Sequence, residues 1–141
     1  MEIEFDLGVN VMADSIQQSV VFKAKANRIY DILIDSKEFA AFTGGKAAKI
    51  DPTAGGAFSV FDGMITGRNV ELLPAKRIVQ AWRAGNWDEG VYSIVRFDLA
   101  GEGTGARLTL THVGFPEEHR PHLASGWQAR YFEPMQAYLS K

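Results

Sequence analysis

The fold is decided by residues 91–113, which read VYSIVRFDLAGEGTGARLTLTHV. Apolar and polar side chains alternate on both sides of a glycine-rich turn at 101–105, which predicts two antiparallel strands joined by a hairpin. Two sets of side chains then share the face predicted to be buried: Ser93, Val95, Phe97 and Leu99 in one strand, and Leu108, Leu110 and His112 in the other. Such alternation is typical of a sheet with one face on the core and one in water.

Further strands precede this hairpin and are joined by short turns, one of which is the hairpin signal Asp62-Gly63. The predicted strands are 15–22, 57–61, 65–73 and 77–83. Together with the hairpin they predict an antiparallel meander. In strand 77–83, alternation leaves either face as the inner one, and the polar Arg83 favours the face that carries Trp82.

Two short helices are predicted after the first strand. One covers 27–34 with Asn27 as its N-cap, and the other begins with Ser36 as its cap and ends at Phe42, before Gly44-Gly45. The predicted domain therefore opens with a strand, two short helices and a glycine break.

The C-terminal segment is predicted to be one long helix. A single apolar stripe at helical spacing is formed by Leu123, Trp127, Tyr131, Met135 and Tyr138. Pro134 lacks a backbone donor and is expected to bend this helix near Arg130. The stripe is long enough to cross the sheet and close a cavity against it.

The length of 141 residues predicts a single domain over 14–141, preceded by residues 1–13 as an extension or an edge strand. An edge strand there would allow a homodimer. The net charge of -2, without basic runs, argues against nucleic acid or an anionic membrane as the main partner. The chain has no cysteine, no signal-peptide pattern at its start and no apolar run of about 20 residues, so a cytoplasmic protein is expected.

Several short signatures carry a family resemblance. They are Met64-Ile65-Thr66-Gly67, Glu71-Leu72-Leu73-Pro74, Trp82-Arg83 with Trp87, Thr111-His112-Val113-Gly114-Phe115-Pro116, and Gly126-Trp127 leading into Tyr131-Phe132. Their order resembles bacterial homologues of the C-terminal domain of the activator of 90-kDa heat-shock protein ATPase, in the START-like (SRPBCC) superfamily. The resemblance runs from about Ser15 to the end. It implies an α+β helix-grip fold, in which a curved antiparallel sheet of about six strands wraps around a long C-terminal helix. In many relatives the cavity takes a small hydrophobic molecule.

Three histidines are candidates for a chemical role. His119 and His122 lie in a polar segment beside Glu117 and Glu118, where solvated side chains are a better interpretation than a zinc site. His112 is predicted to point inward, either as a core histidine bonded to a backbone carbonyl or as a polar anchor or base in the pocket. No catalytic residue, metal or cofactor is predicted, and an enzyme is the less favoured interpretation.

The primary hypothesis is non-enzymatic binding of a small hydrophobic ligand between sheet and helix. The candidate lining residues are Phe42, Phe58, Gln80, Trp82, Phe97, Leu110, His112, Trp127 and Tyr131. Gln80 and Tyr131 are expected to supply polar contacts among apolar walls. Two alternatives stay open: a co-chaperone-like partner of a 90-kDa heat-shock protein ATPase, and a small hydrolase or cyclase that uses His112.

Overall fold

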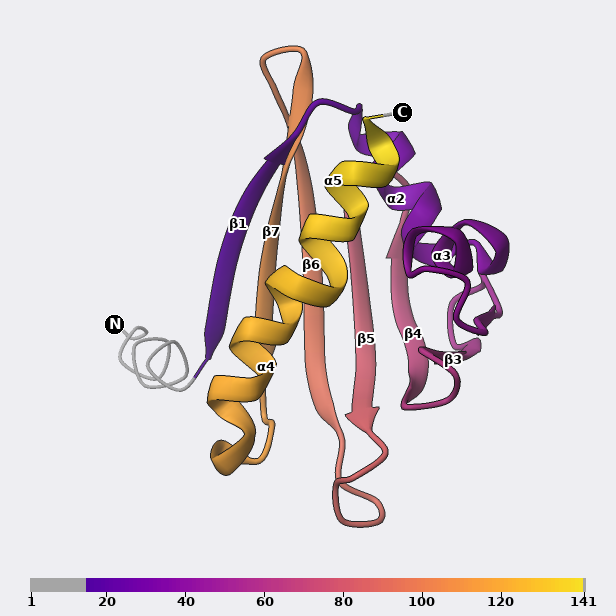
Figure 1. The fold of residues 1–141 in the computed structure, drawn as a ribbon, viewed down its shortest axis with the longest axis vertical. Helices are drawn as coiled ribbons and strands as arrows, with labels where there is room; N and C mark the ends of the chain where they lie inside the picture. Colours follow the sequence, from indigo (N-terminus) through magenta and orange to yellow (C-terminus); the bar gives the residue numbers. More distant parts are fainter. Residues whose placement is uncertain (1–14, 141) are drawn as a thin grey trace.

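A computed structural model describes residues 15–140 and shows the predicted α+β helix-grip architecture (Figure 1). One antiparallel sheet has the strand order β1-β7-β6-β5-β4-β3-β2. The strands are β1 (Ile16–Phe22), β2 (Lys49–Ile50), β3 (Ala57–Val60), β4 (Ile65–Leu73), β5 (Arg77–Ala84), β6 (Ser93–Glu102) and β7 (Gly105–Val113). The predicted sheet of about six strands is thus seven-stranded, because the two-residue β2, too short to show alternation, pairs with β3.

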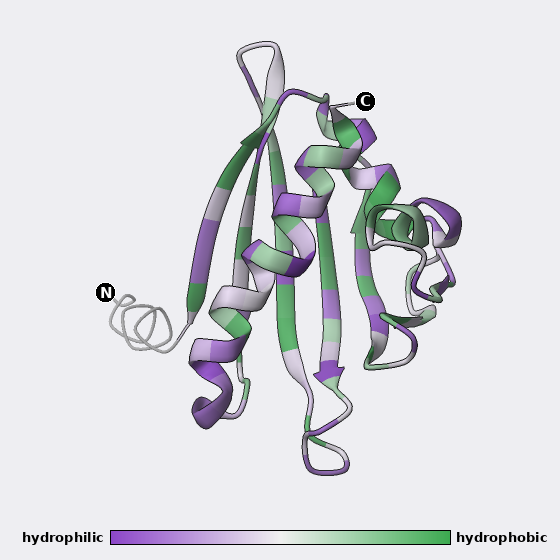
Figure 2. Ribbon diagram, viewed as in Figure 1, coloured by the Kyte–Doolittle hydropathy of each residue, from purple (hydrophilic) through white to green (hydrophobic). Residues whose placement is uncertain are grey.

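The predicted faces of the central strands are confirmed. Along β5 the side chains alternate between half-buried and buried, and Trp82 is on the buried face with 3% of its surface exposed. Along β6 and β7 the buried positions include Val95, Phe97, Leu108 and Leu110. Figure 2 shows hydrophobic and hydrophilic residues alternating along these strands. The inner face carries the core and is the one that the C-terminal helix covers (Figure 1).

The Thr-Gly signature marks a close approach between β4 and β5. Gly67 is opposite Trp82, and a Cβ on Gly67 would lie 1.8 Å from the carbonyl oxygen of Ala81 and 2.8 Å from the Phe58 ring. Only glycine fits where two backbones come this close. A register shift follows between Asn69 and Glu71. The turn before β4 has positive φ at Phe61, Asp62 and Gly63, as the predicted Asp-Gly hairpin requires.

The two short helices form where predicted, but their caps differ. Helix α2 (Ala26–Ile34) begins one residue before Asn27, and its N-cap position, Lys25, makes no side-chain cap. Helix α3 (Ser36–Phe42) is capped by Asp35, whose carboxylate accepts from the backbone N–H of Glu38 at 2.9 Å. Ser36 is therefore not the cap. Its hydroxyl accepts from the N–H of Ile50 instead, at 2.9 Å, because the chain brings β2 alongside.

The C-terminal helical body is continuous but changes its winding. A 3-10 turn (Glu117–His119) leads into α4 (Arg120–Gly126), a π-helical segment (Trp127–Phe132) and α5 (Glu133–Leu139). The predicted disturbance near Arg130 takes the form of this π-helical segment, which ends just before Pro134. π-helical turns within α-helices often occur at functional sites.

Polar contacts fix this helix across the sheet. The side-chain amide of Gln18 in β1 donates to the carbonyl oxygen of Ala124 at 2.8 Å, and Gln128 donates back to Gln18. At the other end, the Tyr138 hydroxyl donates to Glu38 of α3, whose carboxylate also binds Arg28 of α2 through two hydrogen bonds. These contacts hold the helix at both ends, so its middle is placed over the sheet.

Two further predictions concern residues 1–13 and membrane-spanning segments. The possible edge strand at 1–13, and the homodimer that it would allow, lie outside the described residues. Within 15–140, no helix is both long enough and apolar enough to cross a membrane.

Candidate ligand-binding cavity

A cavity of about 210 Å³ lies between the helical body and strands β4 and β5. Its walls are mainly aromatic and aliphatic, with a few polar groups. The lining residues are Phe61, Met64, Ile65, Trp82, Ala84, Asn86, Trp87, His119, His122, Leu123, Gly126, Trp127, Arg130 and Tyr131. Ligand sites typically combine such apolar walls with a small number of polar groups.

The Trp-Arg signature builds one wall of this cavity. Arg83 donates to the backbone carbonyls of Trp87, Asp88 and Val91 at 2.8, 3.2 and 3.2 Å. These bonds hold the β5–β6 connection back against β5. The Trp87 ring is thereby placed 5.7 Å from that of Trp82, and His119 stacks on Trp87 at 6.2 Å.

Trp82, which lines the cavity, has an unsatisfied side-chain donor. Its Nε1 is buried and has no hydrogen-bond partner among residues 15–140. Burial raises the pKa of the neighbouring Tyr131 hydroxyl, and the Trp82 N–H lowers that pKa by a smaller amount. The Trp82 N–H lies near the Tyr131 hydroxyl, but the two groups do not form a hydrogen bond. Leaving a buried donor unpaired costs about 1–3 kcal/mol, so this N–H is a strong candidate to bind an acceptor.

His112 lies behind this wall rather than in it. It has no exposed surface, and its ring contacts Trp82 and Trp127 at centroid distances of 5.0 and 5.6 Å. Trp127 Nε1 donates to His112 Nδ1 at 3.1 Å, and His112 Nε2 lies 2.8 Å from the Ser93 hydroxyl. That hydroxyl in turn donates to the carbonyl oxygen of Trp82. Burial lowers the pKa of His112 to about 3, so the ring is neutral.

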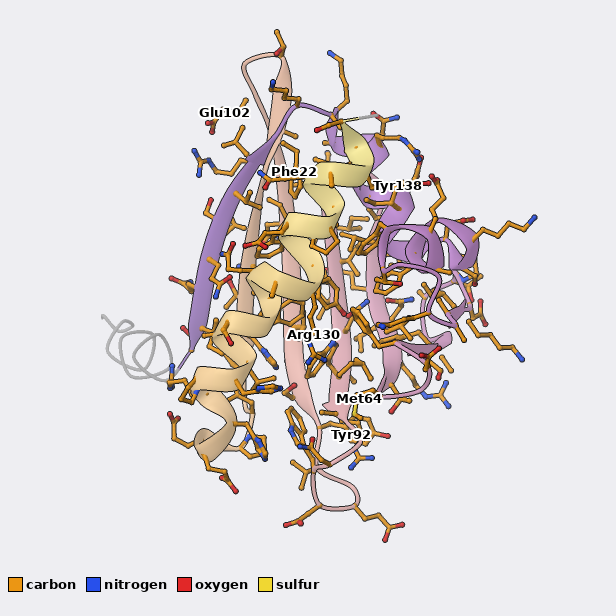
Figure 3. The ribbon with its side chains drawn as sticks, in the orientation of Figure 1. Phe22, Met64, Tyr92, Glu102, Arg130 and Tyr138 are labelled. Atoms are coloured by element: carbon orange, nitrogen blue, oxygen red, sulfur yellow. The ribbon has the colours of Figure 1, made fainter. Side chains whose placement is uncertain are left out.

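The opening of the cavity carries polar and basic side chains. Arg130 and His122 are exposed and His119 is half-buried, and all three line the cavity. Figure 3 shows Arg130 on the side of the helix that faces β4 and β5, with Met64 beyond it. Met64 is 49% exposed and lies at the turn before β4, so it forms an apolar part of this rim.

The nine predicted lining residues separate into three groups. Trp82, Trp127 and Tyr131 line the main cavity. Phe58, Gln80, Phe97 and again Tyr131 surround a second space of only about 10 Å³, which holds one water molecule at most. Phe42, Leu110 and His112 are buried and line neither space. Gln80 donates to Asn69 at 3.0 Å, so it links β4 and β5.

Sequence reasoning missed several lining residues. Trp87 belongs to a signature that was recognised, but its position in a turn hid its inward orientation. Leu123 and Gly126 lie on the helical stripe or beside it. Arg130 was noted only as the site of a bend, and no pattern in the sequence marks it as part of a cavity.

His119 and His122 differ in their surroundings, because His122 is exposed and His119 is half-buried. Glu117 forms an ion pair with Arg120, and His119 stacks on Trp87. No group of three or more histidine, aspartate or glutamate side chains within 15–140 is placed to hold a metal ion.

With fold and cavity in place, comparison with known families is informative. The model of the family of activator of Hsp90 ATPase homolog 1-like proteins matches residues 23–140. The chain belongs to this family. All of the signatures quoted above, from Met64 to Phe132, lie within that span, so the resemblance drawn from them is confirmed.

Individual relatives are more distant. The mouse activator of 90 kDa heat shock protein ATPase homolog 1 is 28% identical over 127 residues, which is 90% of this chain but 37% of the mouse protein. The chain thus spans less than half the length of this relative. An HSP90 activator from Plasmodium falciparum has the same fold, with a TM-score of 0.83 at 22% identity, covering 89% of this chain and 96% of that one. A protein from Chromobacterium violaceum is 28% identical with a TM-score of 0.71 over the same shares of the two chains.

Proposed function

We propose that this family member binds a small, mainly hydrophobic molecule in the cavity of about 210 Å³, without changing it chemically. The observation that carries the proposal is the unpaired, buried N–H of Trp82, a residue of a wall that is mainly aromatic and aliphatic. A ligand oxygen that accepts from this N–H would remove the cost of leaving the donor unpaired.

The volume limits the ligand to about one ring. Typical pockets for drug-sized ligands measure about 300–1,000 Å³, whereas an apolar cavity of about 150 Å³ in another protein accommodates benzene. A space of about 210 Å³ therefore suits a single ring with a short substituent.

Two probes of equal size test the role of the N–H. Acetophenone carries a carbonyl acceptor, and isopropylbenzene has nearly the same size without one. In isothermal titration calorimetry, we expect Trp82→Phe to reduce the ratio of acetophenone affinity to isopropylbenzene affinity by about fivefold, since one neutral hydrogen bond contributes about 1 kcal/mol. An unchanged ratio would remove Trp82 from ligand recognition.

A second variant tests whether the cavity itself is the site. Gly126 lines the cavity in ordinary helical geometry, with φ of -65°, and a Cβ there would meet nothing within 4 Å. Gly126→Leu should therefore fill the space without backbone strain and abolish binding of both probes. Ala129→Leu, at an exposed position that does not line the cavity, is the matched control and should bind normally. Binding that survives Gly126→Leu would place the ligand elsewhere.

A co-chaperone role is the second candidate, favoured by the 28% identity to an activator of 90 kDa heat shock protein ATPase across 90% of this chain. Within residues 15–140, Val21 and Ile94 are among the large hydrophobic side chains that are exposed. These two residues lie at opposite ends of the sheet. Stimulation of the ATPase rate of a purified 90-kDa heat-shock protein tests this role. An unchanged rate, with no complex on gel filtration, would exclude it.

A further inference from the structure

We infer that the ligand is a small aromatic carboxylate, with its ring in the cavity and its carboxylate at Arg130. This inference rests on the proposed function and specifies the class of ligand. Three features carry it: the basic character of the ionisable lining residues, the position of the Arg130 guanidinium, and the aromatic rings that line the space.

The lining residues have a one-sided charge. Arg130, His119 and His122 contribute to the cavity, and among the described residues no aspartate or glutamate does. No ion pair joins Arg130 to any residue of 15–140, whereas Arg28, Arg77, Arg96, Arg107 and Arg120 all form such pairs. Arg130 is thus a cation at a cavity opening with no ion-pair partner in the described part of the chain, and a guanidinium is well shaped to bind a carboxylate.

The burial pattern orients the ligand. A carboxylate in the interior would lose its hydration, which costs several kcal/mol, whereas Arg130 is exposed and offers a charged partner at the opening. Trp82 Nε1 is a neutral donor in the interior without a partner among residues 15–140. The carboxylate therefore belongs at the rim, and a neutral acceptor such as a carbonyl or ether oxygen belongs at the inner end.

The walls favour an aromatic ring between these two ends. Trp82 and Trp87 come from β5 and from the connection that follows it, and Trp127 and Tyr131 come from the helix. The rings of Trp127 and Tyr131 lie 4.4 Å apart, and those of Trp82 and Trp127 lie 5.5 Å apart. Rings at these separations are in contact with one another and form one aromatic wall. A flat ligand ring would pack against this wall.

The test uses 4-acetylbenzoate and its neutral counterpart 4-acetylbenzamide, which have the same size and the same inner acetyl group. We expect the benzoate to bind roughly three- to fivefold more tightly in low salt, as is typical of a partly exposed ion pair. Arg130→Gln should remove this preference and leave the affinity for the benzamide unchanged. Added salt should also reduce the preference. Arg96→Gln, at an arginine paired with Asp98 on the outer face of the sheet, should leave both affinities unchanged.

Each opposite result has a distinct meaning. Equal affinities for the two compounds, or a preference that survives Arg130→Gln, would overturn the carboxylate assignment while leaving the hydrophobic cavity as the site. Binding of acetophenone without binding of either benzoate or benzamide would overturn it as well. If acetophenone and isopropylbenzene also fail to bind, the proposed function itself fails.

Discussion

The indole N–H of Trp127 donates to Nδ1 of His112 across 3.1 Å, which determines where the histidine holds its proton. An indole nitrogen only donates, so Nδ1 must offer its lone pair. The proton of the neutral ring is therefore on Nε2, which donates to the Ser93 hydroxyl 2.8 Å away. Both ring nitrogens are engaged within the core.

This arrangement bears on the hypothesis of a hydrolase or cyclase that uses His112. A general base needs a free lone pair within reach of the substrate. The one lone pair of His112 faces Trp127, and the ring has no exposed surface. The geometry favours a core histidine whose bonds connect β6, β7 and the helix.

The first prediction concerns pH. Burial lowers the pKa of His112 from 6.5 to about 3, so below pH 6.5 the unfolded chain binds a proton that the folded protein does not. The free energy of unfolding should therefore fall as pH decreases from about 6 to 4, and His112 should contribute about 1.4 kcal/mol per pH unit to this fall.

Urea unfolding of the wild type and of His112→Gln at several pH values measures this contribution. The variant should be about 1–3 kcal/mol less stable at pH 7, because its amide does not reproduce both hydrogen bonds. Its stability should then depend less steeply on pH. Parallel pH profiles for the two proteins would mean that His112 takes up its proton in the folded state.

The second prediction concerns Gly67. Its substitution by alanine would bring a methyl group to 1.8 Å from the Ala81 carbonyl oxygen, so β4 and β5 would have to separate. We expect Gly67→Ala to lose at least about 3 kcal/mol of stability. Gly101→Ala is the control, because a Cβ there meets nothing within 4 Å. Thermal unfolding followed by circular dichroism compares the two, and equal melting temperatures would contradict the close approach.

The third prediction concerns the β5–β6 connection. Arg83→Met removes three hydrogen bonds to carbonyl groups and should cost about 1.5–3 kcal/mol. Amide exchange at Trp87 and Val91, whose N–H groups bond within this connection, should accelerate more than exchange in β6. Arg96→Met, which removes an exposed pair with Asp98, serves as the control. Unchanged protection at Trp87 would show that the connection holds its shape without Arg83.

The fourth prediction distinguishes the observed helix cap from the expected one. Asp35→Ala removes the bond to the N–H of Glu38 and should cost about 1 kcal/mol. Asn27→Ala should change the free energy of unfolding by less than about 0.5 kcal/mol, because Asn27 is an exposed residue inside α2. Chemical denaturation measures both. A larger loss for Asn27→Ala would restore it as the cap.

The antiparallel meander, the buried face of β5 and the stripe of the C-terminal helix were predictable from the sequence, whereas the place of β1 beside β7 was not. Alternation and helical spacing are local properties, so Phe97 and Trp127 could be assigned to the inner side without knowledge of their neighbours. For Trp82, alternation left both faces open, and the polar Arg83 next to it favoured the inner one. The cap of α3 was missed by one residue because Asp35 and Ser36 are both good caps in isolation. Only the approach of β2, which engages Ser36, decides between them.

The candidate site was determined by the sequence only in part, through the family signatures and the inward faces of its aromatic residues. Whether an inward side chain borders a void or is enclosed depends on how distant segments fill the space between them. Trp82 and His112 are both inward, yet Trp127 and Phe115 enclose the histidine, while one side of Trp82 borders the cavity. Arg130 joins this site because the helix, held at both ends by Gln18 and Glu38, presents it there. Periodicity tells which way a side chain points, and only tertiary packing decides what it meets.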